Sequence, residues 1–77
     1  MTKKQMWEEV KMIAESELGV ELSEGTTLQE CGLDSLSLVG LLAGLEDTFL
    51  ISFRDEDLMP ENLKTADDIV GLLEKYL

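Results

Sequence analysis

The sequence predicts an all-α fold, a bundle of three main helices plus one short helix, with a long loop between helices 1 and 2. The chain has 77 residues, a length that suits one domain and leaves no room for a second. Hydrophobic residues make up 44% of the chain, enough for a folded core despite its charge, and there is only one proline. We therefore expect residues 1–77 to form a single helical domain.

The first helix is expected to begin near Thr2 or Lys3. Trp7 lies beside its apolar stripe, at the margin of the bundle. Gly19 is a natural end to the helix, because glycine adopts the left-handed conformation without a steric penalty. The stripe itself recurs at helical spacing as Met6, Val10, Ile13, Ala14 and Leu18.

The next segment, residues 20–34, is rich in turn and capping residues and is long for a link between two helices. Such a length indicates a loop that is functional or pinned to the core. Several of its apolar side chains are therefore expected to insert into the core. The candidates are Val20, Leu22, Leu28 and Leu33.

Asp34 is a good N-cap for a second helix that runs from Ser35 to about Phe49. Gly40 and Gly44 lie four residues apart in it and are expected to permit a close approach by another backbone. The apolar face of this helix consists of Leu38, Leu41, Leu42, Leu45 and Phe49. A neighbouring face adds Leu36, Val39 and Ala43, which is more apolar surface than one core needs, so we expect Leu36 and Val39 to be partly exposed.

After the second helix, residues 54–57 are expected to form a charged loop. Pro60 suits the first turn of a short third helix, with Leu63 pointing inward. Thr65 and Asp68 fit an acidic variant of the capping box at the start of the last helix. Its apolar positions repeat as Ile69, Leu72, Leu73 and Tyr76.

The charge of the chain is strongly negative, with 17 acidic and 6 basic residues and a formal net charge of −11. No lysine or arginine occurs between Lys11 and Arg54. Such a surface repels phosphate backbones and anionic lipids, so we expect neither nucleic acid nor membrane as a partner. It would steer encounters with proteins that bear basic patches, but on charge alone the favoured explanation is solubility.

The sequence offers no catalytic or metal-binding set of residues. It has no histidine, and Cys31 is its only cysteine, which excludes an intramolecular disulfide and a multi-thiolate zinc site. The acidic run of residues 55–57 lacks the alternating ligands and the central glycine of an EF-hand loop, so a calcium site is a minor alternative. No segment reads as a signal peptide or a membrane span. We expect a cytoplasmic, monomeric protein that is not an enzyme.

The most informative stretch is Gly32–Leu36, which places the Ser35 hydroxyl at the first turn of a helix, directly after a long loop. A helix N-terminus offers unpaired backbone N–H groups and a positive dipole end, which suit a phosphate ester. Taken alone, this pentapeptide is better explained by ordinary helix capping.

In the context of the whole chain, the sequence resembles the acyl and peptidyl carrier protein family, of the discrete type, over nearly its full length. Each shared motif is weak alone, but their order and spacing are specific. The motifs are Glu17–Val20 closing helix 1, Leu33–Leu36 opening helix 2, Leu45–Asp47 followed by Phe49, and Glu61–Thr65 leading to Ile69 and Leu72. The resemblance implies an acyl-carrier-like bundle.

The resemblance also implies a function for Ser35, with Asp34 and Leu36 flanking it in the Asp–Ser–Leu motif. In that family, a phosphopantetheinyl transferase attaches 4'-phosphopantetheine from coenzyme A to this serine. Acyl or aminoacyl groups then travel as thioesters on the arm, and tethering raises their effective concentration. The implied partners are that transferase, an acyl- or aminoacyl-loading ligase, and synthase or transferase enzymes with basic patches.

Helix 2 is the usual recognition surface of such carriers. By that analogy, the partner-recognition residues are Leu36, Val39 and Ala43 as an apolar patch, with Glu46 and Asp47 as acidic contacts.

One departure bears on the pathway. Fatty-acid carriers usually place an acid two residues after the modified serine and another three residues further on, where this chain has Ser37 and Gly40. This favours a specialised fatty-acid-like, polyketide or peptide pathway. The alternative reading is a small acidic helical interaction module with no prosthetic group, in which Ser35 only caps a helix.

Overall fold

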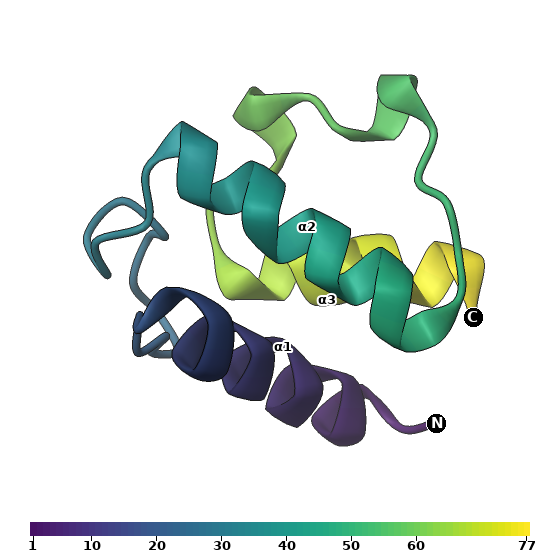
Figure 1. The fold of residues 1–77 in the computed structure, drawn as a ribbon, viewed down its shortest axis with the longest axis horizontal. Helices are drawn as coiled ribbons and strands as arrows, with labels where there is room; N and C mark the ends of the chain where they lie inside the picture. The colour runs from purple at the N-terminus through teal and green to yellow at the C-terminus, as the bar shows by residue number, and fades with distance from the viewer.

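The computed structural model describes residues 1–77, which form three α-helices and two single-turn 3₁₀ helices (Figure 1). The elements are α1 (Lys3–Leu18), α2 (Ser35–Phe49), η1 (Asp55–Asp57), η2 (Pro60–Asn62) and α3 (Ala66–Tyr76). The all-α class, the three main helices and the long loop are thus confirmed. The prediction for residues 54–57 was wrong, because the Asp57 N–H donates to the Arg54 carbonyl and closes an extra 3₁₀ turn there.

Each main helix begins at the N-cap residue that the sequence predicts, and α1 also ends at its predicted glycine. The Thr2 side chain accepts a hydrogen bond from the Gln5 N–H at 3.1 Å, and the Thr2 N–H donates to Gln5 Oε1 at 2.8 Å. Gly19 ends α1 with φ of 65°, the left-handed conformation that glycine tolerates. Thr65 and Asp68 form the reciprocal capping box at the start of α3. Local sequence therefore sets the lengths of these helices.

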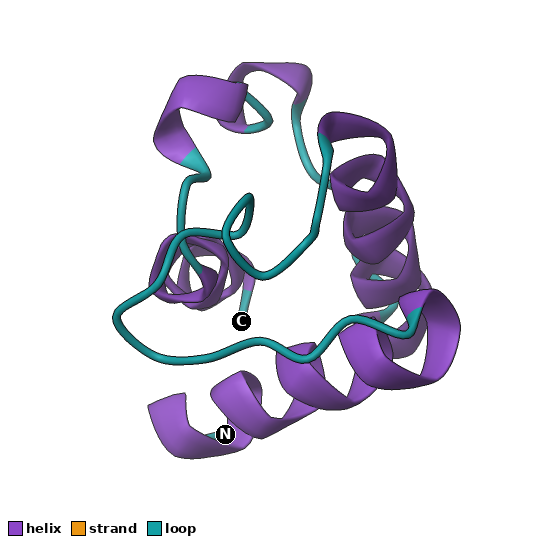
Figure 2. Ribbon diagram, turned by 90° about the vertical axis from the view of Figure 1, so that its left-hand side faces the viewer, coloured by secondary structure: helices purple, strands orange, loops and turns teal.

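The core consists of 17 buried apolar residues and no buried polar side chain, so apolar packing alone holds it together. α1 packs against both α2 and α3. Figure 2 shows α3 nearly along its axis, with α1 and α2 on two sides of it and the 3₁₀ turns on a third. The predicted stripe of α1 lies inside, with Val10 and Ala14 fully buried and Leu18 half-buried at its end.

The loop between α1 and α2 is pinned to the core, as its length and apolar residues predicted. Leu22, Leu28 and Leu33 are buried, and Val20 is half-buried. The Leu28 N–H donates to the Lys64 carbonyl at 2.8 Å. An isolated antiparallel bridge also joins residues 27 and 65. The loop is thereby fixed to the segment that precedes α3, and this fixes the position at which α2 begins.

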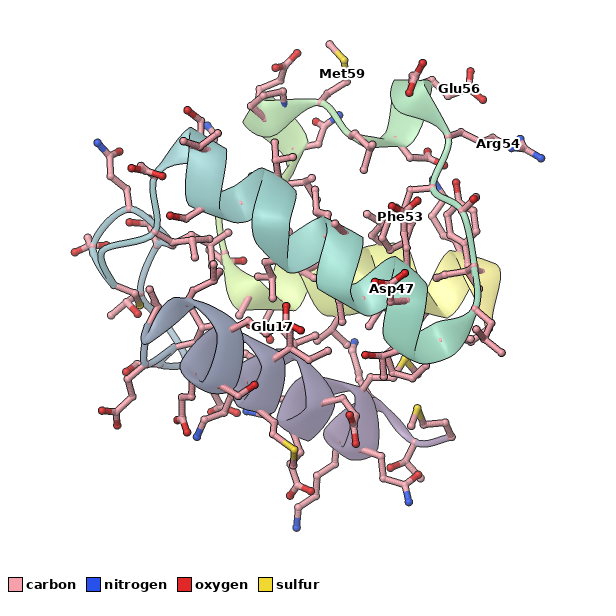
Figure 3. The ribbon with its side chains drawn as sticks, in the orientation of Figure 1. Glu17, Asp47, Phe53, Arg54, Glu56 and Met59 are labelled. Atoms are coloured by element: carbon pink, nitrogen blue, oxygen red, sulfur yellow. The ribbon has the colours of Figure 1, made fainter.

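α1 and α2 approach closely at Gly44. A Cβ added to Gly44 would lie 2.9 Å from Ile13 Cγ2 and 2.7 Å from Glu17 Oε2. Figure 3 shows Glu17 between the two helices. At Gly40 the nearest atom is Leu18 Cδ2, at an ordinary 3.5 Å. The close approach expected at the two glycines therefore occurs at Gly44 alone, and side chains rather than backbone of α1 make it.

The segment after α2 is tied to the end of α3 by Asp57. The Tyr76 hydroxyl donates to Asp57 Oδ2 at 2.5 Å, and Lys75 Nζ donates to Asp57 Oδ1 at 2.9 Å. These two hydrogen bonds, of which the one from Tyr76 has the larger effect, hold the pKa of Asp57 below its ordinary value. Phe53 packs edge-on against the Tyr76 ring, with centroids 5.2 Å apart. The Arg54 N–H donates to the Tyr76 hydroxyl at 2.9 Å, which completes the attachment.

α2 is capped by Asp34, whose Oδ1 accepts a hydrogen bond from the Ser37 N–H at 2.7 Å. Hydrogen bonding to Ser37, mainly to its backbone N–H, lowers the pKa of Asp34. The ionised carboxylate therefore fixes the first turn of the helix and is favoured by the helix dipole.

The two glycines of α2 should respond in opposite ways to a larger side chain. Gly44→Val should lower the free energy of unfolding by about 1–3 kcal/mol, because the buried Ile13 side chain must move. Gly40→Ala should raise it by about 0.5–1 kcal/mol, since it gains helix propensity without a clash. Urea unfolding followed by circular dichroism measures both changes. Equal destabilisation by the two variants would contradict this packing of α1 on α2.

The Asp34 cap should make stability depend on pH. Its folded-state pKa is lowered, so its contribution is present above the ordinary aspartate pKa of about 3.9 and is lost as the pH falls through the lowered value. Asp34→Ala should therefore lower the urea midpoint at pH 7, and the gap to the unmodified sequence should close below about pH 4. Asp34→Asn should retain most of the cap at both pH values. A gap for Asp34→Ala that is the same at pH 7 and pH 3 would refute this role of the carboxylate.

Candidate functional site

The Ser35 hydroxyl is exposed at the first position of α2 and takes part in none of the hydrogen bonds of the structure. The adjacent Asp34 caps the helix instead, through the Ser37 N–H. This geometry separates two roles that the sequence left combined. Asp34 holds the helix end, and Ser35 presents a free nucleophilic oxygen beside it.

Ser35 borders a groove of 630 Å³ between the start of α2, the pinned loop and the segment around η2. Apolar side chains from all three elements line its walls, and polar side chains surround them. The lining residues are Thr27, Leu28, Gln29, Leu33, Asp34, Ser35, Leu38, Pro60, Leu63 and Lys64. Sequence periodicity did not identify this groove, because it lies where the bridge between residues 27 and 65 and the η2 turn bring distant segments together.

The surplus apolar face of α2 is exposed, as predicted. Leu36 is 80% and Val39 63% exposed, and Ala43 also faces solvent. These three residues therefore lie outside the core. They form a surface that starts next to Ser35 and follows the helix.

The two acids expected on that surface differ in their surroundings. Asp47 is exposed on α2 (Figure 3). Glu46 is half-buried, and its Oε2 accepts a hydrogen bond from the Phe53 N–H at 2.8 Å. Glu46 therefore has a structural role that its sequence position did not reveal: it fixes the start of the segment after α2.

The remaining candidates have ordinary surroundings. No group of three or more histidine, cysteine, aspartate or glutamate side chains is arranged to hold a metal ion, and Asp57 of the acidic run faces Tyr76 and Lys75. Cys31 is half-buried, with its sulfur 3.2 Å from Thr26 Oγ1. None of the helices has the length and apolar character needed to cross a bilayer.

The residues around Ser35 fit a phosphopantetheine group. The hydroxyl is free, no side chain of the protein bonds to it, and the groove beside it offers an apolar path. The first turn of α2 adds backbone N–H groups and the positive end of the helix dipole, which favour a phosphate.

Comparison with known proteins agrees with this geometry. The family model described as a phosphopantetheine attachment site matches residues 8–73. The chain is 38% identical to an acyl carrier protein of Exiguobacterium sibiricum over 96% of both chains. It is 35% identical to one of Thermotoga maritima, over 99% of this chain and 96% of the relative.

Solved structures support the same assignment. A crystal structure of an acyl carrier protein from Thermotoga maritima superposes with a TM-score of 0.81, at 25% identity, over 95% of this chain and 87% of that chain. The carrier fold also matches a Bradyrhizobium japonicum structure of a glycine:[carrier protein] ligase complexed with glycylated carrier protein, with a TM-score of 0.67 at 21% identity over 91% of this chain and 96% of that chain. This chain therefore belongs to the acyl carrier protein family, whose members are carriers rather than enzymes and hold a covalently attached 4'-phosphopantetheine.

Proposed function

We propose that Ser35 is the attachment residue of this acyl carrier protein and that it serves a specialised fatty-acid-like, polyketide or peptide pathway. The observation that carries the attachment site is the free, exposed Ser35 hydroxyl at the first turn of α2, next to a groove that can accommodate an arm. When attached, phosphopantetheine supplies a thiol for carrying acyl or aminoacyl groups.

The residues of the chain contribute orientation and charge to the attachment. Asp34 holds the first turn through the Ser37 N–H, so the exposed Ser35 lies at a helix end that this cap fixes. In the transferase complex, Ser35 Oγ bonds to a phosphorus of coenzyme A and gives its proton to the transferase. The bond from that phosphorus to the bridging pyrophosphate oxygen breaks, and the nucleotide portion leaves. The helix N-terminus favours the phosphodiester that remains.

The specialised pathway is proposed from the positions after Ser35. Ser37 and Gly40 occupy positions at which fatty-acid carriers usually have acidic residues. Partner enzymes that bind those acidic side chains would therefore make two fewer contacts with this chain. We include aminoacyl groups in the cargo class because the fold is shared with a carrier that is glycylated in complex with its ligase. The proposed partners are a phosphopantetheinyl transferase, an acyl- or aminoacyl-loading ligase, and synthase or transferase enzymes. We propose that the protein is a monomer and that it meets these partners in the cytoplasm.

The proposed docking surface is the exposed face of α2. Leu36, Val39 and Ala43 supply apolar contacts beside the attachment site, and Asp47 supplies an exposed negative charge further along the helix. A partner with a basic patch around an apolar depression complements this surface. Glu46 contributes less than first expected, because one of its carboxylate oxygens is already bonded to the Phe53 N–H.

Loading of the protein should depend on Ser35 and not on its neighbour Ser37. Incubation with coenzyme A and a promiscuous phosphopantetheinyl transferase should add one phosphopantetheine to the unmodified sequence and to Ser37→Ala. Intact mass spectrometry measures this gain. Ser35→Ala should gain nothing while keeping its stability within about 0.5 kcal/mol, since the side chain is exposed and unbonded. No gain in folded unmodified protein with several transferases would support the interaction module that lacks a prosthetic group.

Charge reversal on α2 should weaken partner binding in a salt-sensitive way. Asp47→Lys should reduce the affinity for a phosphopantetheinyl transferase about 2- to 10-fold at low ionic strength, through loss of one exposed ion pair and gain of a repulsion. Isothermal titration at two salt concentrations measures the change. Glu8→Lys is the control, because it alters net charge equally from an exposed position on α1. Equal losses in both variants would mean that only net charge matters.

A further inference from the structure

Lys64 differs from the other lysines and from the arginine of the chain in its position beside the groove. It lines the groove beside Ser35 and forms no salt bridge. Two further unpaired cations, Lys4 and Lys11, lie on α1. The other three cations are paired: Lys3 with Glu74 at 3.5 Å, Arg54 with Glu56 at 3.7 Å, and Lys75 with Asp57 at 2.9 Å. Among the lysines and the arginine, Lys64 is thus the only unpaired one outside α1, in a chain of net charge −11.

The backbone of Lys64 is fixed while its side chain is free. Its N–H donates to Asp68 Oδ2 at 2.9 Å, and its carbonyl accepts from the Leu28 N–H at 2.8 Å. The preceding Leu63 is buried in the core. The Lys64 backbone is therefore a fixed point on the groove wall, and the ammonium group can move around it as far as its four-carbon stem allows.

The charges in the groove change when Ser35 is modified. Asp34 and Lys64 are the two charged residues that line it. Hydrogen bonding to Ser37 lowers the pKa of Asp34, so Asp34 is negative at neutral pH. A phosphodiester on Ser35 adds a second negative charge next to it. Lys64 is then the one side chain of the groove that attracts the new charge, while Asp34 repels it.

Resting on the proposed attachment at Ser35, we propose that Lys64 Nζ pairs with the phosphodiester and holds the near end of the arm along the groove between α2 and η2. Lys64 is a positioning residue in this account and is not needed for attachment. Exposed ion pairs of this kind shift a population by about 2- to 5-fold, so the arm is biased toward the groove and still free to leave for a partner enzyme. Salt weakens the pairing, because both groups face solvent.

Phosphorus NMR of the loaded protein tests this role directly, since the attached arm contains one phosphorus atom. The loaded proteins compared are the unmodified sequence, Lys64→Gln, Lys64→Arg and, as a control for net charge, Lys11→Gln. At low ionic strength, Lys64→Gln should move the ³¹P resonance toward its position in urea-unfolded loaded protein and narrow it. Lys64→Arg should keep the original position more closely, and Lys11→Gln should leave it unchanged. Adding 1 M NaCl to the unmodified protein should reproduce the shift seen in Lys64→Gln.

The outcomes separate this inference from the function on which it rests. Intact mass recorded before the NMR shows whether each variant carries the arm. Absence of the arm from the folded unmodified protein would overturn the attachment at Ser35 and the role of Lys64 together. If all the proteins are loaded and the ³¹P resonance of Lys64→Gln superimposes on that of the unmodified protein at low salt, only the role of Lys64 fails. An equal shift in Lys11→Gln would also refute it. The salt titration needs no substitution, so a resonance that does not respond to salt counts against the pairing even if a variant is unstable.

Discussion

The structure depends on the attachment of the long loop to the segment that precedes α3. The hydrogen bond from the Leu28 N–H to the Lys64 carbonyl, the bridge between residues 27 and 65, and the burial of Leu28 and Leu33 fix where α2 begins. Without this attachment, a 16-residue gap between helical ends would leave the start of α2 free to move. Residues of this attachment, Thr27, Leu28 and Lys64, also line the groove. One constraint therefore places both Ser35 and the surface beside it.

The division between buried and exposed residues agrees with the function of a carrier protein. The core is made of apolar side chains and contains no polar or charged residue, and the exposed Ser35 is not part of it. Ser35 and the exposed apolar residues Leu36, Val39 and Ala43 of α2 lie outside that core. Members of the acyl carrier protein family are carriers rather than enzymes, so an acid–base pair is not required. In this chain, the capped start of α2 carries the exposed Ser35.

Sequence reasoning located the features that are set by neighbouring residues. The caps at Thr2, Gly19, Asp34 and Thr65 act within one helical turn, so the helix boundaries could be predicted closely. The exposure of Leu36 and Val39 followed from the excess of apolar residues on α2. Features that join distant residues were missed. The bond from Glu46 to the Phe53 N–H, the η1 turn that Tyr76 and Lys75 hold through Asp57, and the groove with Lys64 on its wall all arise from tertiary contacts.

The central claim is that the arm is attached to Ser35 and to no other hydroxyl. Protease digestion of the loaded protein, followed by tandem mass spectrometry of the peptide that contains Ser35 and Ser37, tests it most directly. The account predicts fragment ions that place the whole added mass on Ser35, the exposed and unbonded serine at the first position of α2. Added mass on Ser37, or on a serine or threonine of the loop, would contradict the assignment of the site.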